Sequence, residues 1–177
     1  MYDIFILIDT ESDGIKQERD FHSQKLIEIA LQVRSREAVL ETYHNFVSTV
    51  EEINQAVHPA DHIEYFRNGI SGGVTLARIN EDLARILAKY PQGKIVCHNV
   101  NFDLRLLRYN GIIIDEQRPT ICTMRTNCLP DGKYRKLVDL AKSLNVRTED
   151  IKLHTAVGDV ELLSRCLTSI LQMQCGT

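Results

Sequence analysis

Four acidic residues lie where strands or helices are expected to end, and they are the residues best suited to chemistry. Asp9 and Glu11 follow the apolar run 4–8, so on an extended chain both side chains point to the same side of a sheet. Asp103 follows a second short apolar run at the start of a helix, and Asp159 lies early in the last helix. In an open α/β sheet, ligand sites form at strand ends and nearby helix starts, so we expect these four residues to converge.

A cluster of four carboxylates predicts a metal site. Carboxylates that lie close together repel and raise one another's pKa unless a cation neutralises them. Ligand sets made only of oxygen favour Mg²⁺ or Mn²⁺ over zinc or copper. Taken singly, each acid is better explained as a surface or capping residue. The prediction of a metal site therefore depends on the four acids occurring together and not on any one of them.

His154 is a candidate general base because it lies five residues before Asp159. Positions i and i+5 of a helix are about 140° apart, so the two residues would not share a helical face. We therefore place His154 on the loop before the helix, where it could approach a metal-bound water from the side opposite the carboxylate. An unperturbed histidine pKa of about 6.5 suits a base at neutral pH. An isolated histidine near a helix start more often has no chemical role.

The elements that must position these residues can be read from the hydrophobic pattern. Strands are expected over 2–8, ending at Asp9, then over 25–34 and 38–49 as a hairpin, and over 94–97. Helices are expected over 76–90, 102–110, around 137–144 and over 155–171. Three early strands followed by alternating strands and helices predict an α/β domain with a mixed sheet. No repeat or linker interrupts the 177 residues, so we expect a single domain spanning 1–177.

Composition excludes several classes of protein. The net charge of −3 argues against a protein that coats nucleic acid through its own basic residues, although bound divalent cations can supply positive charge locally. No apolar run is long enough to span a membrane, and the first residues lack the features of a secretory signal, so we expect a cytoplasmic protein that does not bind membranes. The five cysteines lack the C-x2-C spacing of zinc sites and are expected to be reduced and buried, except for Cys175. The motifs of phosphate-binding loops and dinucleotide-binding folds are missing from the sequence.

The motifs D-x-E, H-N-x-x-F-D and H-x4-D occur in ILIDTESDG, IVCHNVNFDLRLL and HTAVGDVELL. In order and approximate spacing, these segments resemble the DEDDh family of 3′–5′ exonucleases from Phe5 to about Leu171. The resemblance implies a ribonuclease H-like fold, with a central five-stranded mixed sheet flanked by helices. It also implies phosphodiester hydrolysis from the 3′ end, with release of nucleoside 5′-monophosphates.

The same resemblance assigns roles to individual residues. It implies that Asp9, Glu11, Asp103 and Asp159 hold two Mg²⁺ or Mn²⁺ ions and that His154 activates the attacking water. The positions that match substrate-binding residues of the family are Thr10, Ser12, Asn99, Phe102 and Asn68. The basic tract 133–136 is a candidate contact for the phosphate backbone.

Two positions depart from the family pattern. Asp13 stands where the family usually has threonine, and Asn68, in the expected loop 68–71, stands where it has histidine. Our hypothesis is that Asp13 weakens binding of the strand, so that Asp13→Thr lowers the apparent KM on single strands.

Several alternatives stay open at this point. Single-stranded or frayed DNA ends are the favoured substrate, with roles in repair or proofreading. An exoribonuclease that trims RNA 3′ ends and a non-catalytic nucleic-acid-binding or proofreading-assembly module are the alternatives. A free-standing enzyme or a homodimer is favoured, and association with a polymerase is left undecided. We interpret His58 and His62 as solvated surface histidines, and Tyr65 and Phe66 as residues that either stack on bases or pack in the core.

Overall fold

The computed structural model describes residues 3–14, 18–50, 53–54, 58, 60–129 and 132–175. The strands are β1 (Phe5–Ser12), β2 (Leu26–Arg34), β3 (Val39–Phe46), β4 (Lys94–Cys97) and β5 (Thr120–Cys122). The α-helices are α1 (Ala60–Ser71), α2 (Leu76–Lys89), α3 (Val100–Tyr109), α4 (Thr123–Thr126), α5 (Leu137–Ser143) and α6 (Ala156–Cys175). A short 3-10 helix, η1 (Glu18–Ser23), lies between β1 and β2.

The five strands form one mixed sheet in the order β3-β2-β1-β4-β5. β1 pairs antiparallel with β2 and parallel with β4, so it occupies the centre of the sheet. β2 pairs antiparallel with β3, and β4 pairs parallel with β5. The predicted α/β class, the hairpin of the second and third strands and the five-stranded mixed sheet are confirmed.

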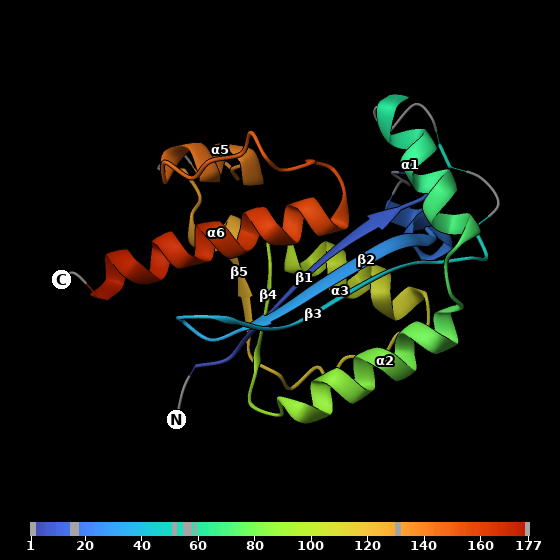
Figure 1. The fold of residues 1–177 in the computed structure, drawn as a ribbon, viewed down its shortest axis with the longest axis horizontal. Helices are drawn as coiled ribbons and strands as arrows, with labels where there is room; N and C mark the ends of the chain where they lie inside the picture. Colours follow the sequence, from blue (N-terminus) through green and yellow to red (C-terminus); the bar gives the residue numbers. More distant parts are fainter. Residues whose placement is uncertain are drawn as a thin grey trace.

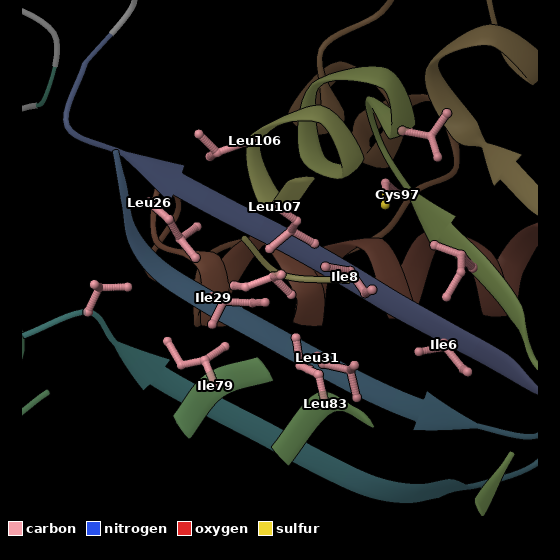
Figure 2. Close-up of a cluster of buried hydrophobic side chains, with 14 of the residues drawn as sticks. Ile6, Ile8, Leu26, Ile29, Leu31, Ile79, Leu83, Cys97, Leu106 and Leu107 are labelled. Carbon is pink, nitrogen blue, oxygen red and sulfur yellow. The ribbon is translucent and has the colours of Figure 1, made fainter. Parts of the chain in front are cut away.

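Helices cover both faces of this sheet, with α5 and α6 on one side and α2 and α3 on the other (Figure 1). The alternation of side chains along β1 divides the core accordingly. Phe5 and Leu7 pack with residues of α5 and α6, whereas Ile6 and Ile8 belong to the cluster on the opposite face. Figure 2 shows Ile6 and Ile8 within that second cluster, which also contains Leu83 of α2. Odd-numbered residues of β1 therefore point to the face covered by α5 and α6, and even-numbered residues point to the opposite face.

Two predicted elements differ from the structure. β1 does not end at Asp9 but continues to Ser12, because Asp9, Thr10 and Glu11 stay paired with β2 up to a register shift between Glu11 and Ser12. The segment 68–71, expected as a loop, is the last turn of α1. Only His62, Ile63 and Phe66 of α1 are buried, so this helix has a narrow apolar face and a weak sequence signal.

The cysteines match their expected state with one exception. Cys97, Cys122 and Cys166 are buried free thiols, whereas Cys128 is exposed, contrary to prediction. The side chain of Cys175 lies outside the described part of the structure, so its prediction stays open. Among the described residues, no helix is both long and apolar enough to cross a bilayer.

Candidate metal centre and catalytic site

Three carboxylates meet at the end of β1. Asp9 and Glu11 have odd numbers, so they point to the face of the sheet that α6 covers, as Phe5 and Leu7 do. Asp159 lies in the first turn of α6. One carboxylate oxygen from each of these three residues lies within 4.8 Å of the other two. The structure therefore brings together three of the four predicted metal ligands from a strand and a helix about 150 residues apart.

Asp103 reaches the site from the opposite face. Thr10 has an even number and points toward α3, where its hydroxyl donates a hydrogen bond to Oδ1 of Asp103 at 2.8 Å. Asp103 shares the sheet-facing side of α3 with Leu106 and Leu107, and only 3% of it is exposed. Thr10 thus links the fourth acid to the middle of the D-x-E motif.

Burial and mutual repulsion dominate the electrostatics of the cluster. Burial first, and then the charges of Asp103, Asp159 and Glu11, raise the pKa of Asp9 well above its usual range. Burial first, and then the charges of Asp159, Glu28 and Asp103, raise the pKa of Glu11 to about 8. Burial raises the pKa of Asp159 to about 6. The pKa of Asp103 rises to about 7, again through burial, although the hydrogen bond from Thr10 lowers it.

His154 stands on the segment before α6, where the sequence placed it. Its φ of 59° is a left-handed conformation, which is uncommon for a residue other than glycine. Its backbone N–H donates to Oδ1 of Asp159 at 3.3 Å, and its side chain is exposed. The backbone of His154 is therefore held beside one of the three clustered carboxylates, and its side chain is open to solvent.

Gly158 permits the close approach of this segment to α6. A Cβ atom at Gly158 would lie 1.9 Å from the carbonyl oxygen of Lys152. The hydroxyl of Thr155 also donates to that carbonyl at 2.8 Å and accepts from the Gly158 N–H at 3.1 Å. The glycine in H-x-x-x-G-D is thus a packing requirement of the turn that carries His154.

Two histidines expected at the surface are buried, so that interpretation is wrong. His58 is 9% exposed and donates from Nε2 to the carbonyl of Ser12 at 2.8 Å. His62 is 6% exposed, and its ring centroid lies 6.4 Å from that of His154. Both rings pack against Phe66 of α1, and the hydrogen bond from His58 adds a contact to Ser12 at the end of β1, so contacts between separate segments bury the two side chains.

The predicted substrate-binding residues fall into different environments. Ser12 is buried, and its hydroxyl accepts from Gln24 and donates to the carbonyl of Gly14. Phe102 packs edge-on against Phe21, with 5.6 Å between ring centroids. Asn99 is partly buried before α3, and Asn68 is exposed on α1.

The departure at Asp13 has a local structural function. Its Oδ1 accepts a hydrogen bond from the backbone N–H of Lys25 at 2.9 Å, beside the register shift at the end of β1. In the predicted backbone-binding tract, His98 holds Arg135 in place by donating from Nε2 to its carbonyl at 2.8 Å. The predicted effect of Asp13 on strand binding and the predicted contact of the tract 133–136 with the phosphate backbone remain predictions.

Sequence reasoning missed Glu28, a fifth carboxylate beside the cluster. Glu28 lies directly opposite Glu11 in the β1–β2 pairing, and none of its surface is exposed. Its charge contributes to the raised pKa values of Asp9, Glu11 and Asp159. The signal in the sequence was a glutamate within the apolar run 26–31, and the strand register was needed to interpret it.

The order of the strands and the helices on both faces of the sheet define the fold class of the protein. Among solved structures, the chain shares its fold with nucleases, including the nuclease domain of 3′hExo, a DEDDh family member bound to rAMP. That comparison gives a TM-score of 0.74 and 14% identity, and covers 98% of this chain and 94% of that one. The ribonuclease H-like fold expected from the sequence is confirmed.

Two further structures extend this likeness. S. pombe Pop2p, in a form bound to Mg²⁺ and Mn²⁺, gives a TM-score of 0.68 and 16% identity over 96% of this chain and 82% of that one. A zinc-bound complex of E. coli ExoI with single-stranded DNA gives a TM-score of 0.69 and 13% identity over 97% of this chain and 41% of that one. No family model matches the sequence, and no curated protein matches it.

Proposed function

We propose that this protein is a metal-dependent 3′–5′ exonuclease that hydrolyses the terminal phosphodiester bond of single-stranded nucleic acid. The observation that carries the proposal is the meeting of Asp9, Glu11 and Asp159 within 4.8 Å on a fold shared with 3′-exonucleases. Asp103, tied to Thr10, completes the set of four acids, and His154 stands next to Asp159. A binding module without activity would not require this costly cluster of acids, of which Asp103 is buried and the other three are half-buried.

The donor set fits divalent cations. The three clustered groups are carboxylates, and the charged neighbours that most affect the pKa of Asp9 are carboxylates too. Such a cluster is stable in its ionised form only when a cation compensates its charge. Hard oxygen donors favour Mg²⁺ or Mn²⁺, and we propose that Asp9, Glu11 and Asp159 with Asp103 hold two such ions. When bound, these ions would activate water and stabilise charge on the leaving 3′-oxygen.

The protein's own residues would then position the metal ions and the attacking water. Asp9 is the acid on which the charges of Asp103, Asp159 and Glu11 all act, so it is central to the cluster. His154 would accept the proton of the attacking water, since its exposed imidazole is anchored by its backbone to Asp159. Asp103 is buried and Asp9, Glu11 and Asp159 are half-buried, which reduces their contact with water and strengthens their interaction with positive charge.

We propose single-stranded or frayed DNA ends as the substrate, with RNA 3′ ends as the second candidate. Structures with this fold include an ExoI complex with single-stranded DNA and a 3′hExo domain bound to rAMP, so both polymers are represented. We therefore propose single-stranded 3′ ends as the substrate and rank DNA before RNA, which is also the order predicted from the sequence.

Matched oligonucleotides test the proposal. DNA and RNA of one sequence, labelled at the 5′ end and carrying a free 3′-hydroxyl, would be digested with Mg²⁺ or Mn²⁺. We expect a ladder that shortens from the 3′ end, release of nucleoside 5′-monophosphates, faster cleavage of DNA, and no cleavage in EDTA. Glu11→Gln should be inactive, whereas Asp82→Asn, which removes a carboxylate remote from the cluster, should cleave normally. Faster cleavage of RNA would reverse the ranking, and no cleavage of either polymer would contradict the proposed activity.

A further inference from the structure

Glu28 is a buried carboxylate that the proposed chemistry does not use. It is not one of the three residues whose oxygens lie within 4.8 Å of one another, although it faces Glu11 across the β1–β2 pair. The charge of Glu28 at this position raises the pKa of Asp9 and Glu11. A glutamate that only filled space would be better replaced by an uncharged residue. Its hydrogen bonds indicate what it does instead.

Both oxygens of Glu28 accept hydrogen bonds from three different elements. Oε1 accepts from the hydroxyl of Tyr65 on α1 at 2.6 Å and lies 2.8 Å from Nε2 of His44 on β3. Oε2 accepts from the backbone N–H of Ala156 at 2.9 Å. Ala156 is the first residue of α6, and the first N–H groups of a helix have no partner within the helix. Glu28 thus links the start of α6 to strand β2.

The bond to Ala156 falls between the two site residues of this turn. His154 precedes Ala156 by two residues, and Asp159 follows it by three. Tyr65 also contacts this segment directly, because Nζ of Lys152 lies 4.2 Å from the centre of its ring. Glu28 and Tyr65 therefore both contact the segment 152–156.

This segment depends on polar contacts for its position. A hollow of about 370 Å³ borders it, lined among others by His44, Tyr65, Lys152 and Thr155. Apolar packing is therefore incomplete on that side of the turn. The left-handed backbone at His154 is a sparsely populated conformation that persists only where surrounding contacts impose it.

We propose that Glu28, held by Tyr65 and His44, is a positioning residue that sets His154 and Asp159 against the carboxylates of β1. This inference rests on the proposed exonuclease function, because its effect on rate is exerted through His154 and Asp159. Glu28 would not bind metal, because its oxygens are not among those that meet within 4.8 Å. A displacement of a reacting group by about 1 Å can lower a rate roughly 100-fold, so the contribution is measurable.

A double-mutant cycle tests this role. We expect Glu28→Ala to lower kcat roughly 100-fold with KM changed less than about threefold, and Glu28→Gln, which can still accept from Ala156, to recover much of that loss. In a His154→Ala background, Glu28→Ala should cost clearly less than in the wild type, because only Asp159 is then left to be positioned. Additive losses, or a wild-type kcat for Glu28→Ala, would overturn the inference.

Two controls separate positioning from other effects. Asp82→Asn removes another buried carboxylate, one bound to Arg78 and Arg85 on α2, and should lower thermal stability while leaving kcat unchanged. Mn²⁺ titration should give the same stoichiometry for Glu28→Ala as for the wild type. A lost Mn²⁺ site in that variant would make Glu28 a ligand and overturn the positioning role.

Amide hydrogen exchange decides the question even if the protein cleaves no nucleic acid. Glu28→Ala should speed exchange in 153–159 at least about tenfold, whereas Asp82→Asn should not. Unchanged exchange there would overturn the inference independently of activity. A wild-type protein that lacks nuclease activity, together with faster exchange in Glu28→Ala, would instead contradict the proposed function alone.

Discussion

The hydroxyl of Thr10 donates to Oδ1 of Asp103 at 2.8 Å and thereby connects the two faces of the sheet at the acidic cluster. Thr10 lies between Asp9 and Glu11 in sequence but points the other way, so the strand delivers two acids to α6 and a donor to α3. Thr10 is 5% exposed and Asp103 is 3% exposed, so water cannot readily replace this bond. The proposed contact of Thr10 with substrate would therefore have to use a group other than its hydroxyl hydrogen.

Thr10→Val is predicted to weaken the site without changing its shape. Valine keeps the volume but removes the donor, so the pKa of Asp103 should rise further above its value of about 7. A more protonated Asp103 binds cations less well at neutral pH. We expect a roughly tenfold loss of activity that is partly recovered at higher Mn²⁺ or higher pH. Thr10→Ser, which keeps the hydroxyl, should behave as the wild type, and equal losses in both variants would refute the role of this bond.

Asp9→Asn is predicted to abolish cleavage and leave the metal-free fold equally or more stable. Neutralising Asp9 relieves its repulsion with Asp103, Asp159 and Glu11. The gain should be about 1 kcal/mol for each pKa unit of repulsion that is removed. Activity should fall at least about 1000-fold. Denaturant unfolding in EDTA checks the stability, and a large loss there would mean that Asp9 has a structural role.

The stability of the metal-free protein should fall as the pH rises. The unfolded chain releases the protons of Glu11 and Asp159 near their usual pKa values, whereas the folded protein keeps them up to about 8 and about 6. The folded state therefore binds more protons at Glu11 and Asp159 within this window, so the contribution of these two residues to the free energy of unfolding decreases with rising pH and levels off above about 8. Thermal unfolding in EDTA from pH 4.5 to 8.5 checks this, and the slope should be smaller in Glu11→Gln. Saturating Mg²⁺ should remove most of the difference, and an identical slope in both proteins would exclude Glu11 as a cause.

Gly158→Ala is predicted to displace the turn that carries His154. The new methyl group would lie 1.9 Å from the Lys152 carbonyl oxygen, so the backbone must move. We expect kcat to fall roughly 10- to 100-fold while KM changes little. Gly72→Ala serves as the control, because the nearest atom to its added Cβ is 3.9 Å away. If the two alanine variants were equally active, the tight turn would not be required for catalysis.

The sequence predicted the parts of this site that depend on local periodicity. Alternation along β1 placed Asp9 and Glu11 on one face, and helical spacing placed Asp159 at a helix start and His154 before it. Glu28 could not be assigned in this way, because its partners Tyr65 and Ala156 lie 37 and 128 residues further along the chain. The burial of His58 and His62 was missed for the same reason, since His58 bonds to Ser12, 46 residues earlier, and α1 packs against β2 and β3.

The most direct measurement of the central claim is a crystal structure of the protein with Mn²⁺ and a nucleoside 5′-monophosphate. Anomalous scattering would locate the ions without reference to the protein's side chains. We predict two Mn²⁺ peaks between Asp9, Glu11, Asp159 and Asp103, with the nucleotide phosphate against them and His154 facing its free side. Mn²⁺ bound elsewhere, or no ordered Mn²⁺ at these carboxylates under saturating conditions, would contradict the proposed two-metal exonuclease site.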